Sequence, residues 1–427
     1  MNSGAIIQTI IAVIALLFGY PYLGSVFILS MIPFVLFMLI KQDARFLPAL
    51  ILHCASATSI TYLIFLTIVI ICLTKARVLF ADKNTRLIFI MLLLALPLYV
   101  VLTYQKMKLD GLTWQVAFHY SSYYLSFWGF LYCFLISKTF DIKTLKLLLC
   151  SLIFVYFVYM FTGYSRVVSM IVFLGVVYGV YMLLNTNNKL MGVIITMGSL
   201  LLFFSNKNMT FTEFFSMAFA VVVYVLFELN KKKMARKAAG WIPYVVIIVL
   251  MVFGINNFQT AQISDFSEHM DFSSWENFWS RVTYKFFEDR AVFWDAGWNQ
   301  LMQIKPVLPM HNIPDIIAYK TSGVVIDDVS FGAHNTPIQL LRIFGFIIGG
   351  LLIVCYILCT TLAATVYTSK NANKWIVPII TVSITNSIVL FLTGTAAMIL
   401  SFSLFSFGLM GITYGISTKQ PNQLDEN

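Results

Sequence analysis

The sequence predicts an all-α polytopic membrane protein with one large external loop. Hydrophobic residues make up 60% of the chain and charged residues only 11%, a composition that excludes an ordinary soluble domain. Apolar runs of membrane-spanning length recur along the chain, and we expect about 12–14 transmembrane helices of roughly 20 residues each. No segments of about ten residues alternate between apolar and polar, so helices rather than a β-barrel are predicted.

The spans follow from these runs in chain order. The first run, 5–20, lacks a basic flank and a small-residue cleavage site, so it is predicted to be a retained span rather than a signal peptide. The region 47–73 reads either as one long span or as two short ones, and the choice decides on which side the N-terminus lies. Further apolar runs that are predicted to span the membrane are 87–102, 145–162, 167–184, 191–204, 211–229, 241–256, 336–362, 376–392 and 396–416.

Charge orients these spans. Segment 258–335 holds 10 acidic and 5 basic residues, a balance of −5, whereas the whole chain is +10 and the remainder therefore +15. Short basic loops stay in the cytoplasm, so the dense run 231–237, the basic segments 75–86, 138–146, 185–189 and 370–374 and the C-terminal tail are predicted inside. The acidic loop is then outside. Three regions result: helices over 1–257, a partly helical external loop over 258–335, and helices with a short tail over 336–427.

Several functions find no support in the sequence. The bases are scattered through short loops beside spans, which indicates topology and not nucleic-acid binding. The six cysteines lie in apolar runs and have no metal-type spacing. No phosphate-binding loop, zinc-protease motif or dinucleotide fingerprint is present. No metal and no cofactor are expected.

The external loop contains a predicted helix over 275–304, because apolar residues recur there at helical spacing. Arg290 falls on that apolar stripe, between Phe286 and Phe293, whereas Arg281 lies on the polar face. An arginine directed into a protein interior needs an anionic partner. That partner is either a fixed one, such as Asp289 or Asp295, or a substrate phosphate.

Two further residues stand at the predicted external surface. Arg166 begins a span after Gly163-Tyr164-Ser165, where it either snorkels to the interface or binds an anion. His334 lies where the loop re-enters the membrane, and a histidine at the water boundary can take a proton from a hydroxyl. Gly345 and Gly349 form a G-x-x-x-G pair in the span that follows, a pattern typical of close helix packing.

These residues together resemble the O-antigen polymerase and ligase superfamily of membrane glycan transferases. Ser165-Arg166 is similar to the family's "SR" signature, and Arg290-Ala-Val-Phe-Trp294 followed by Pro306 to its loop pattern of arginine, tryptophan and proline. Ala333-His334-Asn335 followed by Leu340-Leu341 and Gly345-x-x-x-Gly349 resembles its "HN…L…G…G". The resemblance covers 163–350. The glycines expected after the loop proline are missing, since Pro306 leads to Val-Leu-Pro309.

The resemblance implies a GT-C-like fold and glycan transfer at the external face of a bacterial inner membrane, with the loop periplasmic and the C-terminus cytoplasmic. The donor would be an undecaprenyl diphosphate-linked glycan, and membrane lipid and a chain-length regulator protein would be further partners. His334 would be the base, Arg166 and Arg290 would hold the diphosphate, and Arg281 and Arg342 are the weaker candidates. The leading interpretation is a polymerase of repeat units; a ligase onto lipid A core or protein, and a polysaccharide or lipid transporter, stay open.

Overall fold

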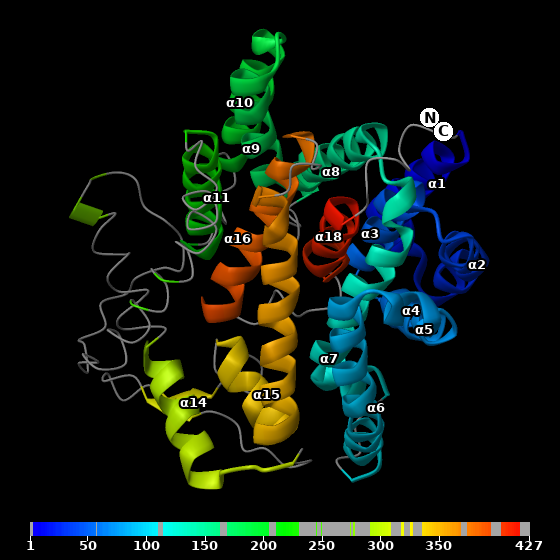
Figure 1. The fold of residues 1–427 in the computed structure, drawn as a ribbon, viewed down its shortest axis with the longest axis vertical. Coiled ribbons are helices and arrows are strands. Elements are labelled where there is room, and N and C mark those ends of the chain that lie inside the picture. Colours follow the sequence, from blue (N-terminus) through cyan, green and yellow to red (C-terminus); the bar gives the residue numbers. More distant parts are fainter. Residues whose placement is uncertain are drawn as a thin grey trace.

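The computed structural model describes residues 3–56, 58–109, 114–162, 169–204, 211–229, 291–308, 317–319, 325–327, 335–368, 374–393 and 403–418, with isolated residues at 245, 249, 274, 276 and 277. This part of the chain is almost entirely helical (Figure 1). The all-helical prediction is therefore confirmed for the described residues, apart from one small β-hairpin.

The first half of the chain forms α1 (Ser3–Ile14), the π-helix η1 (Ala15–Gly19), α2 (Tyr20–Lys41), η2 (Ala44–Phe46), α3 (Leu47–Ala55), α4 (Ser59–Thr74), α5 (Ala76–Ala81), α6 (Lys83–Leu109), α7 (Trp114–Ile136), η3 (Ser137–Thr139), α8 (Ile142–Thr162), α9 (Ser169–Asn185), α10 (Lys189–Phe204) and α11 (Phe211–Leu229). The second half forms α14 (Ala291–Ile304), β1 (Ile317–Tyr319), β2 (Val325–Asp327), α15 (Thr336–Ala364), η5 (Thr365–Thr368), η6 (Lys374–Ile376), α16 (Val377–Thr393), the π-helix η8 (Leu404–Gly408) and α18 (Leu409–Thr418). Helices α6, α8–α11, α15 and α16 lie on predicted apolar runs, whereas α2 and α7 are further apolar helices. The run 396–416 is described only from residue 403, and the run 241–256 lies outside the described residues apart from 245 and 249.

Three helical stretches are long and apolar enough to cross a membrane, among the residues that the structure describes. They are Ser3–Lys41, Lys83–Gln105 and Thr336–Thr368, and seven shorter apolar helices accompany them. The first of the three is broken, because Gly24 inside α2 has a φ of 62° and a ψ of −147°. The helices thus have the length and composition of membrane spans, whereas the total of about 12–14 stays a prediction.

The ambiguous region 47–73 is two helices rather than one. α3 ends at Ala55 and α4 begins at Ser59. The hydroxyl of Thr61 donates to the carbonyl oxygen of Cys54 at 3.1 Å, which satisfies a helix-end group left free by the break. Of the two alternatives that the sequence leaves open, the structure has the pair of short helices.

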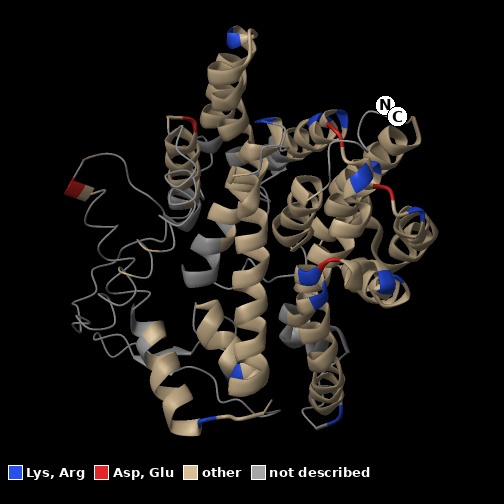
Figure 2. Ribbon diagram, in the orientation of Figure 1, with Lys and Arg blue, Asp and Glu red and all other residues tan. Residues whose placement is uncertain are grey.

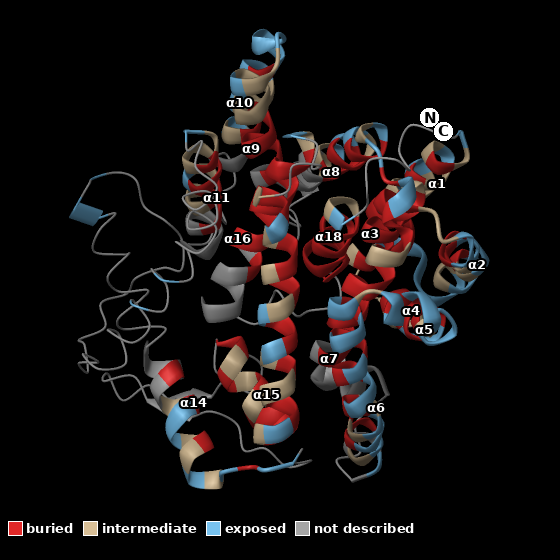
Figure 3. Cartoon of the chain, in the orientation of Figure 1, coloured by how far each residue is buried: buried red, intermediate tan, exposed pale blue. Residues whose placement is uncertain are grey.

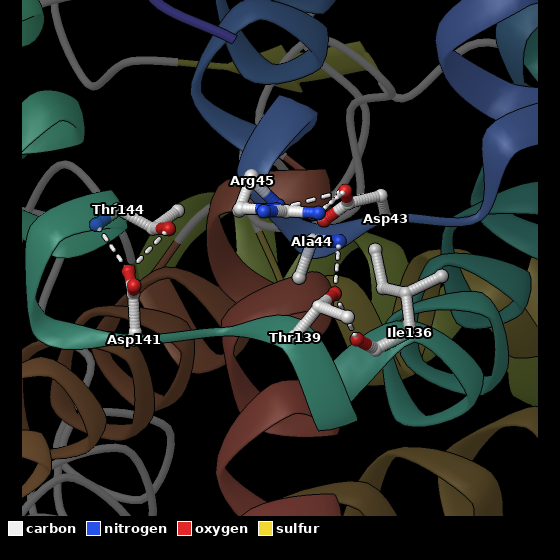
Figure 4. Close-up of polar contacts among 7 residues, drawn as sticks. All are labelled: Asp43, Ala44, Arg45, Ile136, Thr139, Asp141 and Thr144. Atoms are coloured by element: carbon white, nitrogen blue, oxygen red, sulfur yellow. Dashed lines mark hydrogen bonds and ion pairs between the residues drawn. The ribbon is translucent and has the colours of Figure 1, made fainter. Parts of the chain in front are cut away.

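Polar contacts join the segment before α3 to the segment before α8 (Figure 4). The Arg45 guanidinium contacts the Asp43 carboxylate at 2.6 Å, and the backbone N–H of Ala44 donates to the hydroxyl of Thr139 at 2.7 Å. Burial raises the pKa of Asp43, but hydrogen bonds from Arg45 and Thr139 outweigh it and leave that pKa below its ordinary value. Asp43 is therefore a stable anion within a basic segment.

The other basic segments lie at the same end of the helix bundle. The contacts that join them are the stacked rings of Phe140 and Trp375, 6.1 Å apart, the bond from Lys374 Nζ to Asn185 Oδ1 at 3.5 Å, and the bonds of the Tyr414 hydroxyl with Asn84 and Asp82, at 2.9 and 3.2 Å. We call this surface, formed by segments 41–46, 82–86, 137–146, 185–189, 374–376 and 414–418, the basic end. Most described lysines and arginines lie toward it (Figure 2).

The core centres on α7. Its Tyr124, Phe127, Trp128, Phe130 and Tyr132 are all fully buried, and it packs against α4, α6 and α18. Large apolar side chains are exposed instead on α2, α6 and α10 (Figure 3). Apolar side chains in such positions are suited to contact with lipid.

Candidate functional site

α15 is not a straight span, because it breaks at Gly345. Gly345 has a φ of 72° and a ψ of 173°, a conformation open only to glycine. We call 336–344 the first arm and 346–364 the long arm; Figure 1 shows the first arm lying beside the base of the long arm. A Cβ added to Gly349 would meet the Leu340 carbonyl oxygen at 2.6 Å, although residues nine apart in a straight helix are separated by about 13.5 Å.

The break corrects two expectations from the sequence. The run 336–362 was expected to form one returning span, and the helix instead reverses direction near its start, at Gly345. The G-x-x-x-G pair does support close packing, but the surfaces that it brings together are the two arms of one element. Gly345 makes the turn and Gly349 accommodates the backbone of Leu340.

The first arm begins at a well-defined cap. Asn335 is fully buried, and its side-chain oxygen accepts from the backbone N–H of Ile338 at 3.1 Å. Pro337 occupies the first turn, where its missing N–H is no loss. Asn335, which matches the second letter of the "HN" motif, therefore fixes the start of this helix directly after His334.

The segment that leaves α14 fills the break in α15. The backbone N–H of Phe346 donates to the Pro306 carbonyl at 2.8 Å, and that of Ile347 donates to the Val307 carbonyl at 3.3 Å. A Cβ on Gly345 would lie 2.7 Å from the Val307 carbonyl oxygen. The break thus exposes two N–H groups that the loop satisfies, and only glycine allows the loop to approach so closely.

Arg342 links the same two elements by its side chain. It is only 5% exposed. Its Nε donates to Oε1 of Gln300 on α14 at 2.8 Å, and its Nη1 donates to Oε1 of Gln339 on the first arm at 2.8 Å. The guanidinium, which is always charged, is thereby held across the interface between the loop helix and the first arm.

These contacts fix the relative direction of the two helices. Gln300 meets Arg342, and six residues later Pro306 meets Phe346, so residue numbers rise together on both sides and α14 runs parallel to the first arm. Gln300 lies about 13.5 Å beyond the start of α14, and Arg342 lies about 9 Å beyond the start of α15. The two helix starts are therefore staggered by only about 4.5 Å along their common direction.

Of the five predicted site residues, the structure describes only Arg342. Arg166, Arg281, Arg290 and His334 lie outside the described residues. In the sequence, however, Arg290 directly precedes Ala291, where α14 begins, and His334 directly precedes Asn335, which caps α15. Arg342 is described and lies on the first arm of α15.

The predicted loop helix over 275–304 is confirmed over Ala291–Ile304. Of the predicted apolar stripe, the degree of burial is described only for Gly297, which is buried, as are Trp294 and Leu301 on the same helix. Sequence reasoning missed Gln300 and Gln339. Gln339 stands three residues before Arg342 on one helix face, which is a readable signal, whereas nothing local marks Gln300.

The loop also holds a β-hairpin that was not predicted. β1 and β2 pair antiparallel, with Ala318 opposite Ile326, and β1 contacts α14. Each strand has only three residues, too few for the alternating pattern by which strands are predicted.

Comparison with known proteins adds no identity: no protein-family model, curated protein or solved structure matches the chain. Among the described residues, no group of three or more histidine, cysteine or acidic side chains could hold a metal ion.

Proposed function

We propose that the protein is a polymerase that joins lipid diphosphate-linked oligosaccharide repeat units outside the bacterial inner membrane. The observation that carries this proposal is the parallel, nearly level start of α14 and α15. One helix start directly follows Arg290 and the other directly follows His334. On this proposal, two helices held in this way would bring the permanent cation of Arg290 and the ionisable imidazole of His334 to neighbouring positions.

This arrangement suits transfer from a diphosphate donor. Helix N-termini carry partial positive charge, and arginine binds phosphate oxygens with two parallel N–H groups. Arg290, with Arg166 as a second cation and Arg281 as a weaker one, would bind the diphosphate and stabilise the charge that develops as it leaves.

The reaction balances without a redox partner. His334 takes the proton of an acceptor sugar hydroxyl, whose oxygen attacks the anomeric carbon of the donor. The new glycosidic C–O bond forms as the C–O bond to the diphosphate breaks, and the lipid diphosphate departs with the electron pair. A ligase would use the same steps with a lipid A core or a protein as acceptor, so the acceptor separates the two.

Transport is the second candidate, because one feature of the structure favours it. Transporters commonly bind their substrates at broken helices, and both α2 and α15 are broken. In α15, however, the N–H groups of Phe346 and Ile347 are bonded to the chain's own loop carbonyls. This break is therefore a docking site for the loop, and we rank transport below transfer.

Purified protein with a lipid diphosphate-linked repeat unit tests the proposal. We expect a ladder of products longer than one unit, formed equally in excess EDTA. His334→Ala should lower the rate of transfer by about 10²–10⁴-fold because no base remains. Arg290→Lys should also lose transfer activity, because an ammonium group cannot make a two-pronged contact with the diphosphate. Arg281→Ala is the matched control and should matter less.

Other outcomes identify the alternatives. A single glycan added to a core lipid, never a ladder, would indicate a ligase. Movement of the lipid-linked substrate across vesicle membranes without any new glycosidic bond would indicate a transporter. Full activity of well-expressed His334→Ala would exclude His334 as the base.

A further inference from the structure

Gln300 carries no chemistry of its own, yet it contacts the one described arginine of the candidate site. It lies on α14, 42 residues before Arg342 in sequence, and its amide oxygen accepts a hydrogen bond from the guanidinium Nε of Arg342 at 2.8 Å. On the other side of the interface, the amide oxygen of Gln339 accepts a hydrogen bond from Nη1 of the same guanidinium. One planar cation is thus shared between two helices.

We propose that Gln300, Arg342 and Gln339 form a latch that sets the alignment of α14 with the first arm of α15, with Gln300 as a positioning residue. Its role in turnover rests on the proposed function. The rigid fork of a guanidinium fixes both direction and distance, which a flexible ammonium does not. A bond to a charged donor also contributes more to stability than one between neutral groups.

The backbone contacts explain why a side-chain latch is needed. The bonds from Pro306 and Val307 hold the end of α14 at the break in α15. Burial of Trp294 and Leu301 packs the rest of α14 against its neighbours, and the bond of Gln300 adds a defined direction to that packing. Gln300 lies more than one turn before Pro306, so its bond to Arg342 is a second point of attachment, and two points fix the direction of a rod.

The latch governs the starts of the two helices, which Arg290 and His334 precede in sequence. A misplacement of about 1 Å at a reacting centre can cost about 10²-fold in rate. Loss of the latch should therefore lower kcat far more than it changes KM for the lipid donor, because Gln300 does not touch substrate. A residue that merely supports folding would instead lower the amount of folded protein.

Two variants separate the acceptor from the packing. Gln300→Met keeps the length of the side chain but has no strong acceptor, whereas Gln300→Glu keeps an acceptor oxygen at the same place and gains a charge opposite to that of Arg342. Gln303→Met, on the exposed face of the same helix, is the matched control.

The experiment measures alignment and turnover in the same full-length protein. Spin labels at Trp298→Cys on α14 and Val354→Cys on the long arm, both partly exposed positions, report the distance between the elements in a Cys150→Ser background, since Cys150 is the exposed cysteine. We expect Gln300→Met to broaden the distance distribution and to lower kcat by about 10²-fold. Gln300→Glu should restore both, and Gln303→Met should change neither.

An unchanged distance distribution in Gln300→Met would overturn the latch. A broadened distribution with unaltered kcat would overturn the positioning role while leaving the latch in place. If the parent protein shows no transfer at all, the proposed function fails and the positioning role with it, whereas the distance measurement still decides whether the latch exists.

Discussion

At the scale of single residues, Gly345 and Arg342 do most to shape the candidate site. Gly345 supplies a backbone conformation that other residues avoid and leaves room for the loop, and Arg342 fastens the loop helix to the first arm. The sequence marks both positions, one as half of a glycine pair and the other as a cation inside a span. Neither pattern shows that Arg342 contacts Gln300 or that Gly345 contacts Val307, because these partners lie about 40 residues earlier in the chain.

The role of Gly345 is tested by Gly345→Ala. Adopting this conformation costs a residue with a side chain about 1–3 kcal/mol, and contact with the loop backbone adds to that cost. We expect a lower melting temperature in detergent and weaker protection of the Phe346 and Ile347 amides from hydrogen exchange. Gly350→Ala is the control, since an added Cβ there meets nothing within 4 Å. Equal stability of the two variants would contradict this account of the break.

At the scale of elements, hydrophobic runs predicted where helices lie but not how they turn. The starts of α8, α9, α10, α11, α15 and α16 lie close to the predicted ones because apolar length is a strong local signal. The break in α2 and the reversal in α15 were not predicted, since a glycine in an apolar run is usual in membrane helices. The direction of α14 also could not be predicted, because it depends on the contacts of Gln300 and Pro306 with a distant helix.

At the scale of the whole molecule, the distribution of charge predicts which side of the membrane each end of the protein faces. Among the segments predicted inside, those that the structure describes at 82–86, 138–146, 185–189 and 374 are joined by the contacts of Thr139, Trp375, Asn185 and Tyr414. Their common location is a property of the fold. That this end faces the cytoplasm follows from the preference of short basic loops for that side, and stays a prediction.

Thiol labelling tests the orientation. Ser274 is exposed and lies in the acidic segment, so Ser274→Cys in a Cys150→Ser background should react with an impermeant reagent in intact cells. Lys189→Cys, at the basic end, should react only after lysis. The reverse pattern would move the candidate site to the cytoplasm and remove its access to an exported lipid-linked donor.

The central claim is that two latched, parallel helices bring positions 290 and 334 together, and cross-linking measures this directly. Packed helices lie about 8–10 Å apart, and with a stagger of about 4.5 Å their starts should be separated by roughly 10 Å. In a Cys150→Ser background, Arg290→Cys paired with His334→Cys should be joined by a bifunctional thiol reagent of that length, with the linked peptides identified by mass spectrometry. Gln300→Cys with Arg342→Cys is the positive control, and Arg290→Cys with Lys374→Cys is the negative control. Linkage of the 290–334 pair is the result that the account predicts; linkage of the positive control alone would show that the helix starts diverge and would contradict it.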